Sequence, residues 1–220
     1  MRPMRMILAT IVTVGILALA SPSANAHPHV WVTMETTVLY GEGTITGLQQ
    51  AWTFDEFYTQ QAIEGLDKNG DGKYDRQELQ ELAQVNIDGL KEFAYFTFAK
   101  LGDKELKFKP PIDYWLNYTD KGVLTLHFTL PLEQPVPVTT PGFTFAIFDS
   151  SYFIAFDFAQ QNPVKLGAHA PVGCKAQIHD PSEDEDTKRL NDAFSSAMGN
   201  GGTVSLGSGG KTVAVECAKS

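Results

Sequence analysis

The sequence has only two cysteines, and it has no long apolar run outside its first 26 residues. No other stretch therefore approaches the roughly 20 consecutive apolar residues that a membrane-spanning helix needs. Cys174 and Cys217 stand far apart and outside any C-x-x-C pair. In an oxidising compartment we expect them to form one disulfide, with paired metal thiolates as the less favoured alternative.

Basic residues are also scarce. The chain has 17 Lys and Arg against 26 Asp and Glu, a formal net charge of −9. Without Arg2 and Arg5, which lie in the first 26 residues, the net charge falls to −11. Such an acidic chain is not expected to bind nucleic acid or anionic lipid surfaces. It suits a protein that handles cations.

The first 26 residues are organised like a secretory signal. Arg2 and Arg5 form a positive segment, Met6 to Ala20 is apolar, and Ala24-Asn25-Ala26 is a small-x-small cleavage site. The apolar run is too short for a comfortable membrane span. We therefore expect cleavage after Ala26, export, and a mature single domain over residues 27–220.

One twelve-residue stretch, DKNGDGKYDRQE, matches the calcium loop of an EF-hand at every ligand position. Calcium prefers six to eight oxygen ligands, and this spacing wraps side-chain and backbone oxygens around one centre. Gly72 falls where the loop must turn sharply with positive φ. The alternative is a solvated turn between two helices. The expected calcium ligands are Asp67, Asn69, Asp71, Lys73 (through its backbone carbonyl), Asp75 and Glu78.

Hydrophobic patterns predict strands on both sides of a helical middle. The predicted strands cover residues 29–40, 44–54, 106–109, 112–118, 123–130, 143–149, 152–158, 174–178 and 212–217. The predicted helices cover 57–66, 76–100 and 180–198, the second with Leu79, Leu82, Val85 and Leu90 on its buried side. Segments 131–141 and 162–171 are predicted links. The fold class is α+β: antiparallel β-sheets with an inserted EF-hand-like helical hairpin at about 55–100 and a C-terminal helix–strand segment.

The segment HPHVW carries a second candidate site. In an extended chain residues i and i+2 point the same way, so His27 and His29 would face one side and suit Zn²⁺, Ni²⁺ or Cu²⁺. Pro28 has no N–H, which blocks the square-planar amino-terminal copper/nickel site that requires that amide. Further ligands could come from His127, His169 or Asp149. The alternative is an ordinary strand start, with the other histidines exposed or hydrogen-bonded.

Several of these motifs resemble a known family. HPHVWV after a signal-like segment, AWTFDEFYT before the D-x-N-x-D-G loop, FDSSYFIAF and a late cysteine are similar to the periplasmic ZevA-like proteins, once labelled a domain of unknown function. Some members are described as periplasmic components of ABC-type transporters. The resemblance implies a periplasmic accessory of a nickel/cobalt-exporter-type permease in zinc, nickel or cobalt transport. It also implies that His27 and His29 are transition-metal ligands and that the Asp67–Glu78 loop holds calcium.

The combined expectation is a non-enzymatic metal-handling protein whose partner is an inner-membrane metal permease. No Ser/His/Asp or Cys/His arrangement is readable from the spacing, and we expect no small organic substrate. Two alternatives stay open. One is a copper-binding redox protein or enzyme that uses the amine and ring of His27. The other is a calcium-stabilised interaction domain.

Overall fold

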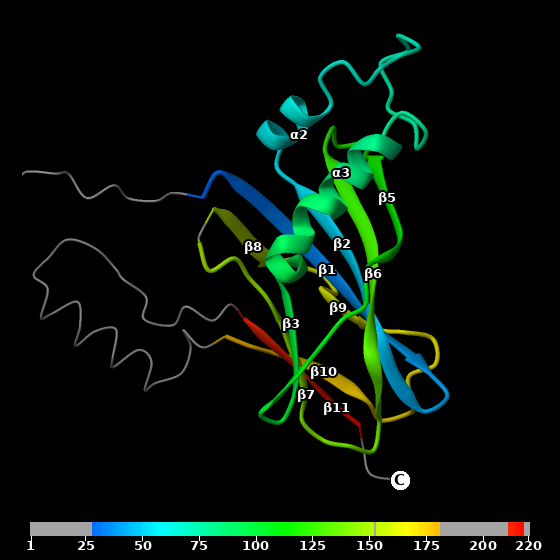
Figure 1. Ribbon diagram of the computed structural model, residues 1–220, viewed down its shortest axis with the longest axis vertical. Helices are drawn as coiled ribbons and strands as arrows, with labels where there is room; N and C mark the ends of the chain where they lie inside the picture. Colours follow the sequence, from blue (N-terminus) through cyan, green and yellow to red (C-terminus); the bar gives the residue numbers. More distant parts are fainter. Residues whose placement is uncertain (1–27, 152, 181–210, 218–220) are drawn as a thin grey trace, which may run out of the picture.

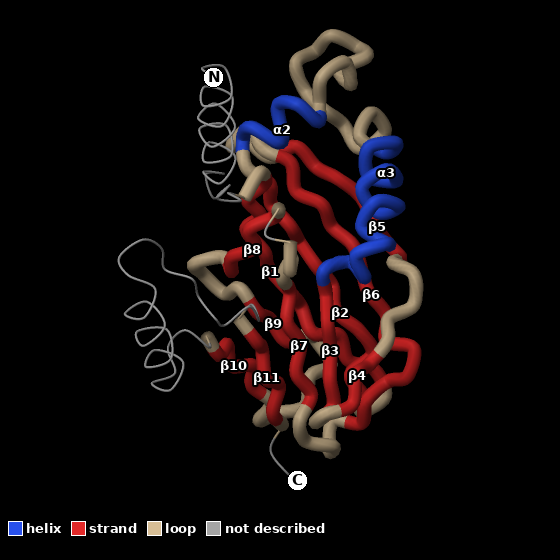
Figure 2. The backbone as a smooth tube through the Cα atoms, turned by 60° about the vertical axis from the view of Figure 1, so that its left-hand side comes forward, coloured by secondary structure: helices blue, strands red, loops and turns tan. Residues whose placement is uncertain are grey.

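Two β-sheets share one apolar core in the computed structural model, which describes residues 28–151, 153–180 and 211–217 (Figures 1 and 2). The first sheet has the order β5 (Ile112–Tyr118), β6 (Leu124–Pro137), β2 (Thr44–Phe54), β1 (Val30–Gly41), β8 (Ile154–Phe158), and β9 (Val164–Leu166) also pairs with β1. The second has the order β10 (Lys175–His179), β11 (Thr212–Glu216), β7 (Phe143–Ile147), β3 (Thr97–Leu101), β4 (Lys104–Leu106).

The first sheet is mixed rather than purely antiparallel, which corrects the predicted topology. β1 pairs antiparallel with β2, but β8 and β9 both run parallel to it. After β7 in the second sheet, the chain returns to the first sheet beside the start of β1. There β8 begins with Ile154 opposite Val30, so the two strands run in the same direction. The pairs shown in the second sheet are antiparallel, as expected.

Strand alternation divides the first sheet into a core face and an outer face. Along β1 every second residue from Val30 to Tyr40 is buried. The register aligns Met34, Trp52 and Leu126 in one row of the core face. Trp52 and Phe128 meet edge to face, with ring centroids 4.9 Å apart. The outer face carries the side chains between them, including His127.

Two helices precede β3 and lie near one end of the molecule, at the top of Figure 1. They are α2 (Glu56–Ala62) and α3 (Gln80–Leu90), and a 3₁₀ segment, η1 (Lys91–Phe96), follows α3. The predicted helix over 76–100 is therefore too long. Ala94 and Tyr95 take positive φ values of 52° and 55°, which turn the chain out of the helix and into β3.

The buried side of α3 matches the prediction at Leu79, Leu82 and Leu90, which are buried or packed against the core, and differs from it at Val85. Leu79, Ala83 and Ile87 are buried, a four-residue repeat that follows one side of a helix. Val85 is 61% exposed, because it lies on the opposite side. The helix α2 ends at Ala62, short of the predicted residue 66, so it does not run directly into the loop that begins at Asp67.

Two predicted links contain strands. β6 continues through the Pro-rich segment to Pro137, and β9 lies within 162–171. The register of β2 against β6 shifts between Ile45 and Gly47. At Gly47 a Cβ atom would stand 2.5 Å from the carbonyl oxygen of Leu130, so the close approach of these strands requires glycine.

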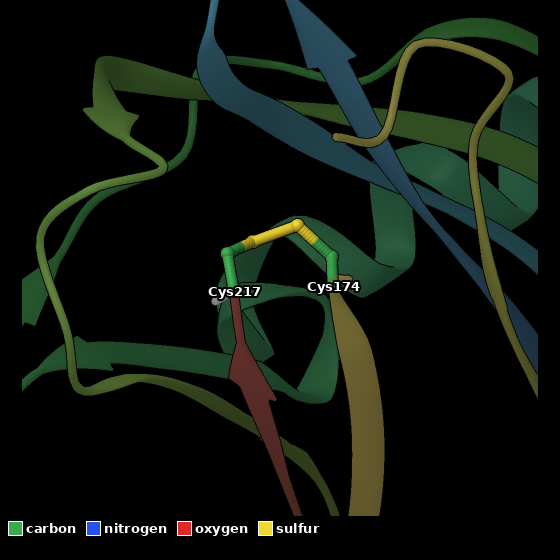
Figure 3. The surroundings of a disulfide bond; sticks show 2 residues. All are labelled: Cys174 and Cys217. Atoms are coloured by element: carbon green, nitrogen blue, oxygen red, sulfur yellow. A yellow bond between two sulfur atoms is a disulfide. The ribbon is translucent and has the colours of Figure 1, made fainter. Parts of the chain in front are cut away.

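The predicted disulfide between Cys174 and Cys217 is confirmed (Figure 3). Cys174 directly precedes β10 and Cys217 directly follows β11, so the bond closes the end of this strand pair. The described residues contain no helix that is long and apolar enough to cross a membrane. The predicted signal segment 1–26, His27 and the predicted helix 180–198 (apart from Asp180) lie outside the described residues.

Candidate functional site

The loop from Asp67 to Glu78 is organised by its own side-chain oxygens. Asp67 accepts hydrogen bonds from the backbone N–H groups of Gly70 at 2.8 Å and Gly72 at 3.0 Å. Asn69 accepts from Asp71 N–H at 2.8 Å. Gly72 has a φ of +74°, as predicted for the sharp turn. The side chains named as ligands thus already point into the loop and fix its path.

The second half of the loop is held in the same way. Asp71 accepts from Lys73 N–H, and Asp75 accepts from the N–H groups of Gln77 and Glu78, at 2.8 to 2.9 Å. Glu78 reaches back across the loop and accepts from Lys68 N–H at 3.0 Å and Asp75 N–H at 3.1 Å. Glu78 therefore links the start of the loop, at Lys68, to its second half, at Asp75.

The donor set fits calcium in type and order. The loop offers carboxylate and amide oxygens with a backbone carbonyl at Lys73, and hard oxygen ligands are the ones calcium takes. No group of three or more His, Cys, Asp or Glu side chains within the described ranges is already drawn together around a metal position. The same carboxylates are engaged by backbone N–H groups, so ion binding would exchange these hydrogen bonds for metal–oxygen contacts.

The loop rests on strand β5. Tyr74 packs against Tyr118 with ring centroids 4.9 Å apart, and the Arg76 guanidinium lies 4.7 Å from the centre of the Trp115 ring. Leu79, directly after the loop, is fully buried. An open cavity of about 1240 Å³ lies between the loop, α3 and β5, and its mixed polar and apolar lining includes Glu78, Asp113 and Trp115.

His127 lies on the outer face of the first sheet. Its ring stacks on Trp115 at 4.0 Å, and its Nε2 atom is 2.7 Å from Oδ1 of Asn117. An amide oxygen only accepts, so Nε2 carries the proton in this contact and Nδ1 is left as the acceptor. Burial lowers the pKa of His127; the charge of Arg76 lowers it further, and Glu35 only partly opposes this. A neutral imidazole is the form that binds metals.

His29 lies where three distant segments meet. Its backbone N–H donates to Phe153 O at 2.8 Å, and its exposed ring lies against the Phe153 ring at 4.9 Å. Two residues on, Trp31 N–H donates to Asp55 Oδ2 at 2.8 Å, and Asp55 N–H donates back to Trp31 O at 3.0 Å. His29, Asp55 and Phe153, one from each of three segments that carry the resemblance, therefore lie together at the start of β1.

Asp149 organises the turn that leads into β8. Its Oδ1 accepts from the N–H and hydroxyl of Ser151, and its Oδ2 accepts from Ile154 N–H at 3.0 Å. Burial alone would raise the pKa of this carboxyl, but these hydrogen bonds and one from Phe153 N–H outweigh burial and lower the pKa. Asp149 is therefore an anion whose oxygens are already used, which makes it a structural residue of this turn.

The histidines named from the sequence are not gathered into one place. His127 stands opposite Ala51, which stands opposite Glu35, and Glu35 is six residues beyond His29 along β1, about 20 Å at the rise of a strand. His169 is exposed in the segment between β9 and β10. The residues that the sequence did not single out are Trp31, Asp55 and Arg76. Only Asp55 had a usable signal, because Asp before a helical pattern is a common N-cap, and it caps α2 by accepting from Tyr58 N–H.

Comparison with known proteins gives a family but no activity. The model of the family described as "Protein of unknown function (DUF1007)" matches residues 12–217. The chain belongs to the DUF1007 family. An uncharacterized protein of Haemophilus influenzae is 26% identical to this DUF1007 chain over 187 residues, which are 84% of each protein. An uncharacterized 15.5 kDa protein of Spirochaeta aurantia, in the trpE 3′ region, is 35% identical over 100 residues, 46% of this chain and 70% of the relative.

Proposed function

We propose that this protein is an exported, non-enzymatic metal-handling protein with a structural calcium loop. The observation that carries the proposal is the loop itself, in which Asp67, Asn69 and Asp71 direct their side-chain oxygens to backbone N–H groups of the loop. A solvated turn does not need Glu78 to reach back over the loop to Lys68 N–H. The net charge of −9 and the disulfide both fit a cation-handling protein in an oxidising compartment.

The second part of the proposal is a transition-metal site at the start of β1. His29 is exposed there, and no charged group of the described residues is in hydrogen-bond contact with it, so its imidazole would be available to Zn²⁺, Ni²⁺ or Co²⁺ together with His27. The partner would be an inner-membrane metal permease, as the resemblance to ZevA-like proteins implies. Calcium in the loop would stabilise the fold, while the site at His29 would carry the transported ion.

Zinc titration of the purified chain 27–220 tests the transition-metal site. We expect His29→Ala to weaken zinc binding at least tenfold, about 1.4 kcal/mol, and His179→Ala, a matched control, to leave it unchanged. His127→Ala and His169→Ala, measured separately, decide whether either ring contributes. Unchanged zinc affinity in the His29 variant would show that the zinc site does not lie at the start of β1. Native mass spectrometry of the exported protein would show whether zinc, nickel or cobalt accompanies calcium.

A calcium-stabilised interaction domain is the second candidate. Trp31, Phe57 and Phe153 are more than half exposed, which favours a contact surface. Calcium-dependent melting without any binding of zinc, nickel or cobalt would support this candidate. The copper alternative needs a second imidazole beside His27, and oxygen-dependent turnover with a reductant would be its signature.

A further inference from the structure

Three large aromatic side chains are exposed at the start of β1. Trp31 is 53% exposed, Phe57 66% and Phe153 53%. We call these three residues the aromatic end. Soluble proteins seldom expose contiguous apolar patches without a use for them, whereas isolated exposed apolar residues are ordinary. The question is therefore whether these three belong together.

Hydrogen bonds hold the three residues on one framework. Trp31 N–H donates to Asp55 Oδ2 at 2.8 Å, and Asp55 N–H donates to Trp31 O at 3.0 Å. Asp55 also caps helix α2, whose first turn contains Phe57. Phe153 accepts from the backbone N–H groups of His29 and Val30. Strand β1, helix α2 and the turn before β8 thus position the aromatic end before any partner arrives, which reduces the entropy lost on binding.

The two stretches of chain that carry the aromatic end are acidic. Residues 28–67 and 146–164, the two stretches of sequence that contain the aromatic end, have no Lys or Arg. Asp55, Glu56 and Asp149 lie beside the aromatic residues along the chain, and Asp149 stays ionised because its hydrogen bonds lower its pKa. Among the described residues, two lysines from elsewhere reach these segments: Lys165 pairs with Glu35 and Lys211 pairs with Asp157. Neither Glu35 nor Asp157 is one of the three carboxylates beside the aromatic residues.

We propose that the aromatic end docks onto another protein that presents an apolar pocket rimmed by Lys and Arg. Aromatic residues, Trp above all, dominate the energetics of protein interfaces, and complementary charge steers the partners together. Anionic lipid would be repelled by the same carboxylates. This inference goes beyond the proposed metal function, because the docking surface requires neither the calcium loop nor a transition metal.

Photo-crosslinking in cells that produce the full chain tests the docking surface. Benzoylphenylalanine replaces Phe57, and in a matched control it replaces Val85, which is 61% exposed on α3. We expect a crosslink to one protein from position 57, at least fivefold stronger than from position 85. The crosslinked peptide should map to a surface with apolar residues beside Lys or Arg. The charge reversal Glu56→Lys should reduce the yield at least threefold, with near-ultraviolet circular dichroism confirming the fold.

Three results would overturn the proposal. Equal yields from positions 57 and 85 would mean that the aromatic end is not a preferred contact. A crosslinked surface without basic residues, or a yield unchanged by Glu56→Lys, would remove the charge complementarity. Binding of the purified chain to phosphatidylcholine vesicles that is lost in Trp31→Ser would identify a lipid surface as the occupant instead. Zinc affinity of the same variants is measured in parallel, so that loss of docking is distinguished from loss of the metal site.

Discussion

The guanidinium of Arg76 lies over the indole of Trp115, with its Cζ atom 4.7 Å from the ring centroid. Arg76 belongs to the candidate calcium loop, and Trp115 belongs to strand β5 and stacks on His127. A cation over an indole contributes about 0.5–1 kcal/mol at an exposed site. The loop is therefore attached to the first sheet through a side chain next to a ligand position, and movement of the loop would change the surroundings of Trp115.

Calcium binding should consequently be visible in the fluorescence of Trp115. In a Trp31→Phe background, with Trp52 buried, we expect calcium to shift the emission and to raise the melting temperature. Glu78→Gln should weaken calcium binding at least tenfold, about 1.4 kcal/mol, because the amide has no charge to offer the ion. Glu81→Gln, an acid on α3 outside the loop, is the matched control.

The melting temperature reports calcium binding, and the emission of Trp115 reports the contact between the loop and strand β5. A rise in melting temperature with unchanged emission would show that calcium binds the loop and that the contact of Arg76 with Trp115 does not report this binding. If calcium moves neither quantity, the loop is a solvated turn. Arg76→Ala should reduce the emission shift while it leaves calcium affinity within about threefold, since the side chain is not a ligand.

Asp149 should give the protein a stability that acid removes. Its pKa is lowered in the folded protein, so ionised Asp149 contributes stability that is fully present above the unfolded value of about 3.9 and is lost as the pH falls through the folded value. The free energy of unfolding should therefore decrease as the pH is lowered from about 5. Asp149→Asn should flatten this dependence, and it should lower stability at pH 7 by about 1–3 kcal/mol.

Urea unfolding at several pH values checks this expectation. Asp120→Asn, at an exposed turn, is the control and should keep the acid dependence of the parent protein. An Asp149 variant with the same acid dependence as the parent would show that its hydrogen bonds do not stabilise the fold through its charge.

Local signals in the sequence were enough for the loop and for the bounds of β2 and β5, but not for β4 (Lys104–Leu106), which ends where the predicted strand 106–109 begins. The boundaries of β2 and β5 are those predicted, because alternating apolar residues run up to clear turn residues on both sides. The loop follows the order of its Asp, Asn and Gly residues, because Asp67 and Asn69 accept from backbone N–H groups only two to five residues ahead. Where the determining contacts are local, the sequence is sufficient.

The errors fall where distant contacts decide the structure. Ala94 and Tyr95 carry no residue signal for positive φ, and the chain turns there because β3 pairs with β7 about 50 residues away. The parallel entry of β8 beside β1 depends on a similar long-range pairing. His127, Trp115 and Arg76 meet for the same reason, so a sequence reading could list His127 as a ligand candidate but could not find its neighbours.

The disulfide should contribute substantially to stability. Cys174 and Cys217 are 43 residues apart, and closing a loop of that length restricts the unfolded chain by about 4 kcal/mol in the chain-entropy account. We expect a reductant, or Cys174→Ser with Cys217→Ser, to lower the free energy of unfolding by about 2–4 kcal/mol. Urea unfolding with and without reductant measures it, and the double-serine variant should be insensitive to the reductant. A parent protein equally stable in both conditions would contradict the expectation.

Thr36 and Gln50 form a polar contact inside the core. The net contribution of this hydrogen bond to the free energy of unfolding should be smaller than the cost of removing only one partner. Thr36 Oγ1 donates to Gln50 Oε1 at 2.7 Å, both residues are fully buried, and Gln50 Nε2 has no partner within the described residues. Thr36→Val should cost about 1–3 kcal/mol, because it leaves the Gln50 oxygen buried and unpaired as well. Thr36→Val combined with Gln50→Met should recover part of that loss, since the apolar pair leaves no unsatisfied group. Urea unfolding of the parent, the two single variants and the double variant measures the coupling energy between the two residues. Thr33→Val, on the exposed face of β1, is the control. If the two changes in free energy simply add, the pair is not coupled.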